Sequence, residues 1–212
     1  MSDRFAGFRD FVTNEAELEA VIPPPLPQIA GKVVDRLDEV CRGFIARSPF
    51  CVLASANPDG HIDLSPKGDP AGFVKVLDDS HLAIPDRPGN RRADTFRNLL
   101  RDPRLGMIFL IPGKTETLRI SGEARIVRDR DLRESMAIDG RVPALAIVLH
   151  VERAFIHCPK CMIRSGLWEP ERWPGSTDLP DIGKAMIAQA KLDMTEDELF
   201  DLVTREGLTT LY

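Results

Sequence analysis

Apolar and polar residues alternate in short runs through the middle of the chain, and turn-forming residues separate these runs. The clearest run is Thr117 to Val127, where apolar positions recur at nearly every second residue, as in a strand with one buried face. The turns include Asn57-Pro58-Asp59-Gly60, in which proline fixes φ and glycine accepts a positive φ. Similar runs predict strands at residues 50–56, 61–65, 72–77, 80–84, 104–111 and 144–156.

A different spacing, of three and four residues, predicts helices. The longest is expected from Gly31 to Ala46, where valine, leucine and isoleucine recur at this spacing. Shorter helices are expected at residues 14–21, 91–101, 129–137, 181–192 and 195–205. The prolines of residues 23–27 predict an extended connector, and residues 158–174 predict a loop.

Six or seven strands with only short helices between them favour a mainly β fold, an antiparallel β-barrel with peripheral helices. A parallel sheet would need a long helix between most strands, and the chain lacks that pattern. We expect three parts: an N-terminal arm with a short helix at residues 1–30, the barrel at residues 31–157, and a C-terminal loop with helices at residues 158–212. The last part would pack on the barrel or on a partner subunit.

The net charge of the 212-residue chain is −5, which argues against nucleic acid as a partner. No apolar run is long enough for a membrane span, and the first residues lack an apolar leader, so we expect no membrane association. Four cysteines in a chain of this length do not indicate a disulfide framework. The expected location is therefore the cytoplasm.

Residues 84–92 (IPDRPGNRR) place three arginines, two prolines and a glycine between an expected strand and an expected helix. Arginine forks bind phosphate oxygens in pairs, and a helix N-terminus adds free N–H groups. Cations at a helix start oppose the helix dipole unless an anion is present. The segment therefore predicts a phosphate site in an otherwise acidic chain, with solvated surface arginines as the alternative.

Several of these segments together resemble the pyridoxamine 5′-phosphate oxidase-like flavoproteins, which are FMN-binding split β-barrels. The resemblance rests on the turn at residues 57–60, the segment DLSPKGD at residues 63–69, the arginine-rich segment, and NLLRDPR at residues 98–104. It covers residues 44–151 well, and residues 158–168 are similar to a bacterial subgroup of FMN-dependent enzymes.

The resemblance implies a homodimer with FMN at the subunit interface and a small-molecule substrate. Asn90, Arg91 and Arg92 would hold the phosphate, and Thr117 or Arg119 would approach the pyrimidine side of the ring. The other residues that it implies for FMN are Ser65, Pro66 and Lys67 along the ring and ribityl chain, Ile84, Pro85 and Asp86 before the arginines, and Arg164, Ser165 and Trp168 from the C-terminal part of either subunit.

The chain also departs from the oxidase itself. Ile62 stands where that enzyme has an arginine, five residues before the equivalent of Lys67, and its C-terminal pattern for the substrate phosphate is missing. The resemblance therefore carries the FMN site better than the site for pyridoxamine phosphate. Alternatively, Lys67 is a solvated lysine in a turn, and Trp168 packs within a loop or at a subunit interface.

The function expected from these observations is an FMN-dependent oxidoreductase that transfers hydride or electrons to a small substrate. One alternative is a flavin-binding module without turnover. Another is a haem-binding relative of the same fold, for which the histidine candidates are His61, His81, His150 and His157. The motif Cys158-Pro159-Lys160-Cys161 favours neither zinc nor thioredoxin-like chemistry, because no second such motif and no βαβ context accompany it. No metal is expected.

Overall fold

The computed structural model describes residues 4–212, which form two compact units. The first unit ends at Val33 and contains two short helices, α1 (Glu15–Val21) and α2 (Pro27–Ala30), with no buried residue in either. The second unit runs from Val34 to Tyr212 and carries the sheet.

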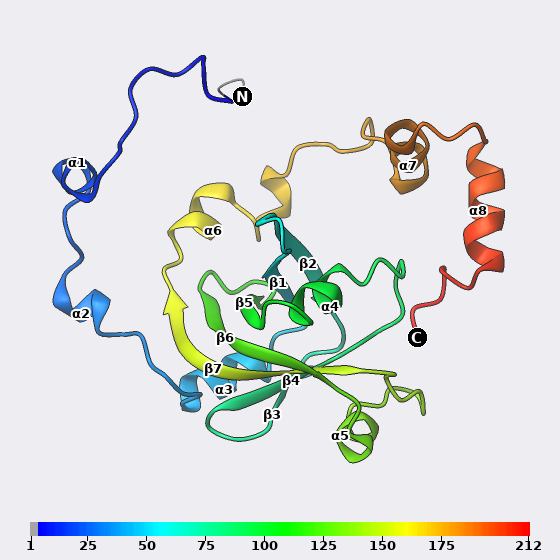
Figure 1. Ribbon diagram of the computed structural model, residues 1–212, viewed down its shortest axis with the longest axis horizontal. Coiled ribbons are helices and arrows are strands. Elements are labelled where there is room, and N and C mark those ends of the chain that lie inside the picture. The colour runs from blue at the N-terminus through cyan, green and yellow to red at the C-terminus, as the bar shows by residue number, and fades with distance from the viewer. Residues whose placement is uncertain (1–3) are drawn as a thin grey trace. The chain divides into compact units, whose positions relative to one another are not determined.

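The second unit is built on one seven-stranded sheet in the order β2-β1-β5-β6-β7-β4-β3, with every neighbouring pair antiparallel. Figure 1 shows that β6 and β7 curve strongly, so that the two ends of the sheet run in different directions. The mainly β, antiparallel barrel with peripheral helices is thus confirmed. The strands are β1 (Phe50–Ala56), β2 (Ile62–Gly68), β3 (Lys75–Val76), β4 (His81–Pro85), β5 (Arg104–Leu110), β6 (Thr117–Val127) and β7 (Ala146–His157).

Alternation along the strands builds the core. In β1 and β5 every second residue is buried, and Leu53 and Phe109 are completely enclosed. The long pair β6–β7 continues the core, with a β-bulge between Ser121 and Gly122. At this bulge the backbones lie so close that a Cβ atom on Gly122 would stand 1.9 Å from the carbonyl oxygen of His150.

The helices of the second unit are short and lie around the sheet (Figure 1). Thr195 starts the last of them with a capping box: its side chain accepts from the N–H of Glu198, whose carboxylate accepts from the N–H of Thr195. The helices are α3 (Glu39–Ile45), α4 (Asp94–Leu99), α5 (Arg130–Ser135), α6 (Lys160–Ser165), α7 (Ile182–Ala190) and α8 (Glu196–Arg205), with a 3₁₀ turn at Pro170–Arg172.

The helix predicted at residues 31–46 is wrong in its first half. Val34 is extended and exchanges backbone hydrogen bonds of 2.9 and 2.8 Å with Ala154, and the Leu37 N–H donates to the Asp79 carbonyl at 2.7 Å. The backbone groups there pair with other segments instead of forming a helix, and Asp38 caps the start of α3. Val34 and Leu37 still pack against the core, from a segment that is not helical.

Three smaller predictions are also wrong. The strand predicted at residues 72–77 is reduced to β3, because Phe73 and Val74 are buried as loop residues without strand pairing. The connector expected to be extended contains α2, where Pro27 occupies the first helical turn, the one place a helix accepts proline. The loop predicted at residues 158–174 contains α6 and the 3₁₀ turn.

Candidate functional site

The edge strand β2 reverses the usual placement of polar and apolar residues: its inward residues are polar, and its outward residues include exposed apolar ones. Strand pairing places its polar residues Asp63, Ser65 and Lys67 opposite three buried residues of β1. These buried partners are Ser55, Leu53 and Cys51, respectively. Directly paired residues share a face of the sheet, so three polar side chains of β2 point to the inner side. Its outward residues include Ile62 and Leu64, whose exposed fractions are 65% and 69%. Polar side chains on the inner face of a sheet, next to the hydrophobic core, indicate a ligand site.

The arginine-rich segment lies across from this inner face. The strand β4 is buried, and the Asp86 N–H donates to the Leu145 carbonyl at 3.0 Å where the segment leaves the sheet. The segment then turns into α4, and Arg91 adopts a positive φ of 58°. Such a conformation is rare outside glycine and concentrates at functional positions.

Between β2 and this segment lies a cavity of about 570 Å³, within the size range of small-molecule sites. Of the fourteen site residues predicted from the sequence, it brings together Ser65, Pro66, Lys67, Asp86, Asn90, Arg91 and Arg92. Ile84 and Pro85 are buried in β4 and do not line it. The sequence therefore indicated both walls of one cavity from segments about twenty residues apart.

Four cations line the cavity, and three of them have carboxylate partners. Arg87 donates from Nε to Asp69 at 2.6 Å, and Arg92 donates from Nε to Asp94 at 2.7 Å. Arg91 pairs with Glu206. Lys67 has no hydrogen bond or ion pair with any of residues 4–212, although its charge acts on the buried Cys51 and on Asp86. Lys67 is thus the cation most open to an anionic ligand.

Residues 206–212, here called the C-terminal segment, lie beside the cavity. Arg91 donates from Nη1 to the Glu206 carboxylate at 3.1 Å and from Nη2 to its carbonyl oxygen at 2.5 Å. Figure 1 shows the loop before α4 reaching toward this end of the chain. The Glu206 carboxylate therefore occupies the fork that the sequence assigns to a phosphate.

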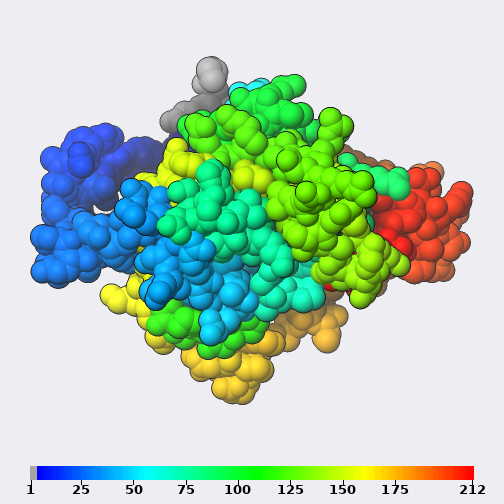
Figure 2. Space-filling model, turned by 90° about the horizontal axis from the view of Figure 1, so that it is seen from below, coloured from blue at the N-terminus to red at the C-terminus, as the bar shows by residue number. Residues whose placement is uncertain are grey.

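Tyr212 fixes the other end of the C-terminal segment. Its hydroxyl donates to Asp69 at 2.7 Å, which raises the pKa of Tyr212, and its carbonyl oxygen accepts from Arg141. Figure 2 shows the red C-terminal residues directly against the light-green residues around α5, in agreement with the Arg141 contact. The Asp69 side chain is 0% exposed, so Arg87 and Tyr212 together satisfy a buried carboxylate.

A buried amide connects the two walls of the cavity. Asn98 of α4 donates from Nδ2 to the Ser55 hydroxyl at 3.0 Å and to the Asp63 carboxylate at 2.7 Å. Both hydrogens of the amide are used, so α4 is held at a fixed distance from β1 and β2. Asn98 thereby fixes the position of α4, the helix that begins at Asp94, two residues after Arg92.

Asp86 is half-buried in the cavity wall, and burial raises its pKa above the ordinary 3.8 in spite of the nearby Lys67 and Arg87. The folded protein therefore holds this proton more tightly than the unfolded chain, and stability falls as pH rises through that window. Asp86→Asn cannot ionise, so the variant does not lose stability when the pH rises through this window. We expect the variant to be more stable than the wild type at neutral pH, with a difference that shrinks to zero at pH values below 3.8.

Urea unfolding at a series of pH values measures this difference. Asp102→Asn provides a control of opposite sign, since Arg104 lowers the pKa of Asp102 to about 2. The stability that Asp102 contributes is present above its ordinary pKa and is lost as pH falls through about 2. A gain for Asp86→Asn that is the same at every pH would show that charge at Asp86 is not its cause.

Five predicted site residues lie outside this cavity: Thr117, Arg119, Arg164, Ser165 and Trp168. Thr117 is buried, and its hydroxyl is the one buried side-chain oxygen or nitrogen among residues 4–212 without a hydrogen-bond partner. Arg119 is exposed on the same strand and lies 3.4 Å from His157. Trp168 donates from Nε1 to the Lys114 carbonyl at 2.8 Å. Thr117, Arg119 and Trp168 therefore lie near the β5–β6 turn and are here called the second group, while Arg164 and Ser165 lie on α6, which precedes Trp168 in the chain.

Sequence reasoning missed Asp63, Glu206 and Tyr212. Asp63 could have been found, because strand alternation places it on the same side as Ser65 and Lys67. Nothing in the spacing of Glu206 and Tyr212 relates them to the arginines, which precede them by more than a hundred residues.

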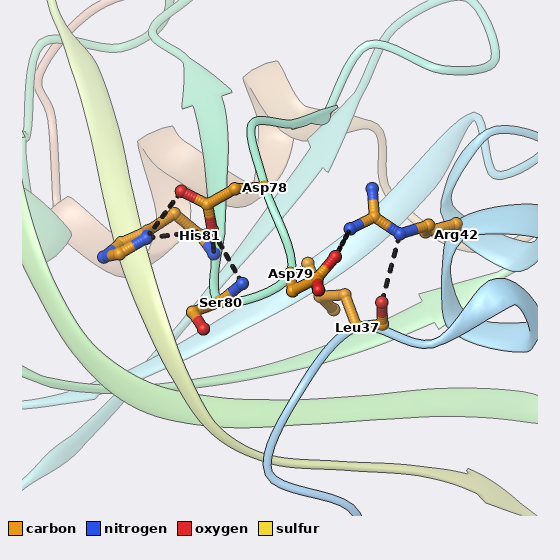
Figure 3. Close-up of polar contacts among 6 residues, drawn as sticks. All are labelled: Leu37, Arg42, Asp78, Asp79, Ser80 and His81. Atoms are coloured by element: carbon orange, nitrogen blue, oxygen red, sulfur yellow. Dashed lines mark hydrogen bonds and ion pairs between the residues drawn. The ribbon is translucent and has the colours of Figure 1, made fainter.

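A separate polar cluster lies at the turn between β3 and β4 (Figure 3). Asp78 accepts from the N–H groups of Ser80 and His81 at 2.7 and 2.8 Å and contacts the His81 ring at 3.0 Å. Asp79 accepts from Arg42 at 2.6 Å, which ties the turn to α3. These contacts account for the local charges and hold the hairpin in place.

The four histidines do not gather at the cavity. His81 and His150 stack edge-to-face across β4 and β7, and neither His61 nor His157 lines the cavity. Among residues 4–212, no three His, Cys, Asp or Glu side chains are grouped so as to hold a metal ion. None of the helices in the described part of the chain is long and apolar enough to cross a bilayer.

The model of the pyridoxamine 5′-phosphate oxidase family matches residues 37–158, more than half of the chain. The chain belongs to this family. No curated protein matches it. The matched region contains both walls of the cavity and ends at Cys158, so α6, the Trp168 loop and the C-terminal segment lie outside the part that the family model describes.

Three similar solved structures differ considerably from this chain in sequence. HupZ from Group A Streptococcus is 20% identical, with 56% of this chain and 92% of that chain covered and a TM-score of 0.46. General Stress Protein 26 from Bacillus anthracis is 13% identical, with 56% and 91% covered and a TM-score of 0.43. A pyridoxamine 5′-phosphate oxidase-related, FMN binding protein from Nostoc punctiforme is 14% identical, with 51% and 72% covered and a TM-score of 0.37.

Proposed function

We propose that this chain is an FMN-dependent oxidoreductase that binds the flavin in the cavity between β2 and the arginine-rich segment and acts on a small molecule. The observation that carries the proposal is the reversed pattern of β2, whose polar inner face meets Arg91 and Arg92 across one cavity. Membership of the pyridoxamine 5′-phosphate oxidase family supports it. When bound, FMN supplies the capacity to accept or donate hydride and electrons.

The residues divide into two roles. Arg91 and Arg92, with Asn90 beside them, would bind the phosphate, because planar guanidinium forks match its oxygens. Ser65, Pro66 and Lys67 would hold the rest of the cofactor, and the Lys67 cation would stabilise negative charge on the reduced flavin. Asn98 keeps the two groups at a fixed separation.

We include a homodimer in the proposal. The exposed Ile62 and Leu64 make the outer face of an edge strand apolar, a feature that proteins normally cover. The second group of predicted residues, near the β5–β6 turn, would then reach the cavity of a partner protomer.

A haem protein is the less favoured alternative, since none of the four histidines lines this cavity. A flavin-binding module without turnover would use the same cavity, so only a reaction separates it from an enzyme.

Absorbance spectroscopy of the freshly purified protein tests the proposal, with any released flavin identified by chromatography. We expect FMN at close to one per chain, or its uptake when FMN is added, and bleaching at 450 nm with a reductant followed by reoxidation with substrate. A protein that contains no flavin and takes up none would refute the cofactor assignment. If FMN is bound but its absorbance does not respond to a reductant or a substrate, the protein is a flavin-binding module without turnover.

Glu206→Gln is expected to bind FMN up to about five-fold more tightly than the wild type, because the carboxylate competes with the phosphate for Arg91. The effect is small because the pair is solvent-exposed and the bond from Arg91 to the Glu206 carbonyl remains. Fluorescence titration with FMN measures it. Glu196→Gln, at the start of the helix that Glu206 caps and paired with Lys184, is the matched control and should leave the affinity unchanged.

A further inference from the structure

The four cysteines fall into two chemical classes. Cys41 and Cys51 are buried, and burial raises the pKa of each thiol to about 12, so neither is reactive at neutral pH. Cys158 and Cys161 are exposed, and all four are free thiols. Thiol chemistry at the surface of this protein is therefore confined to one pair.

The exposed pair lies where a strand passes directly into a helix. β7 ends at His157 and α6 begins at Lys160, so Cys158 precedes the helix and Cys161 lies in its first turn. Pro159 between them has helical dihedral angles. The pair has the Cys-X-X-Cys spacing that disulfide oxidoreductases use, which makes an intramolecular disulfide between the two residues feasible.

The charged residues in the stretch around the pair are all basic. From Arg153 to Trp168 the chain has no aspartate or glutamate, although the whole protein is acidic. Lys160 lies within the motif, Arg164 follows on α6, and Arg119 of the adjacent strand contacts His157. Reactive cysteines occur in exposed, electropositive surroundings of this kind.

The sequence alone does not favour thiol redox chemistry at this motif, but the structure leaves both thiols free and exposed. We propose that Cys158 and Cys161 form a redox-active dithiol that reduces low-molecular-weight disulfides, an activity separate from the flavin site. One thiolate attacks a sulfur of the disulfide RSSR and forms a mixed disulfide, and the first RS⁻ leaves and is protonated to RSH. The second thiolate attacks the mixed disulfide, closes the Cys158–Cys161 bond and releases the second RSH. The pair loses two electrons and two protons, and RSSR gains them.

The same chemistry affects a segment that touches the barrel. α6 leads through Gly166 to Trp168, whose indole N–H donates to the Lys114 carbonyl at the β5–β6 turn. The start of this helix carries the disulfide in the oxidised state, so oxidation constrains the segment next to the second group of predicted residues.

Thiol counting and intact mass on the native full-length protein, treated with oxidised glutathione, test the proposal. We expect two rapidly reacting thiols before treatment, none afterwards, and a product lighter by two hydrogen atoms with no glutathione attached. Cys158→Ser and Cys161→Ser should each instead gain one glutathione. Dithiothreitol-driven reduction of oxidised glutathione should fall to background in both variants.

Two results would overturn the proposal: native thiols that do not react, or a wild type that keeps glutathione as an adduct. Because Cys158 and Cys161 are exposed, neither single serine variant disturbs the core, and circular dichroism checks that the variants are folded. The assay gives the same expected result whether FMN is bound or absent, so it stands apart from the cofactor proposal.

Discussion

Replacing both Arg91 and Arg92 by alanine is expected to weaken FMN binding at least ~100-fold while leaving riboflavin affinity nearly unchanged. Riboflavin lacks the phosphate but keeps the ring and ribityl chain, so the difference between the two ligands isolates the phosphate contribution. Each charge-assisted hydrogen bond contributes about 1.5–3 kcal/mol. The two arginines already form ion pairs with Glu206 and Asp94. These pairs are solvent-exposed, so giving them up offsets little of the free energy of phosphate binding.

Arg104→Ala is the matched control for this experiment. Arg104 is 80% exposed and pairs with Asp102 two residues away, just as Arg92 is 71% exposed and pairs with Asp94. Arg104 does not line the cavity. Isothermal titration of the control should give wild-type affinity for both ligands. An equal loss of FMN and riboflavin in the double variant would mean that the arginines maintain the fold of the segment and do not bind phosphate.

Gly122→Ala is expected to lower the free energy of unfolding by about 3 kcal/mol or more, at or above the upper end of the range for overpacked sites. The new methyl group would stand 1.9 Å from the His150 carbonyl oxygen and 3.0 Å from the Glu152 nitrogen. Both atoms are backbone, so no side chain can move aside, and the β6–β7 pair itself must separate. A loss of this size is a large part of the 5–15 kcal/mol that stabilises typical domains.

Gly106→Ala, in the neighbouring strand β5, is the control for adding a methyl group to this sheet. Its Cβ would lie 3.8 Å from the Ala54 Cβ, an ordinary contact, so we expect a change below about 1 kcal/mol. Thermal and urea unfolding compare the two variants. If Gly122→Ala were as stable as Gly106→Ala, the close approach at the bulge would not be a feature of the folded protein.

The elements that depend on local alternation were predictable from the sequence. The strand expected at residues 117–127 coincides with β6, because burial alternates with a period of two from Leu118 to Arg125. The two walls of the cavity could be recognised in the sequence for a similar reason: β2 and the arginine-rich segment are each short, local and chemically distinctive. The structure adds that these two segments face each other.

Contacts between distant segments were not predictable. The helix expected at residues 31–46 competes with pairing between Val34 and Ala154, a partner that no local pattern identifies. The same holds for Arg91 and Glu206, whose partnership depends on the path of the chain after α6. The inner placement of Asp63 lies between these cases, since it needs the strand and the side of the core to be known together.

Anion binding in the cavity and docking of the C-terminal segment oppose each other, because both use Arg91. Arg91 has one fork, so an anion that takes it from Glu206 loosens the segment, and loosening of the segment raises the affinity for the anion by the same factor. Tyr212 remains held through Asp69, which does not line the cavity, so the release is confined to the Glu206 end. The order of this end of the chain therefore reports whether the cavity is occupied.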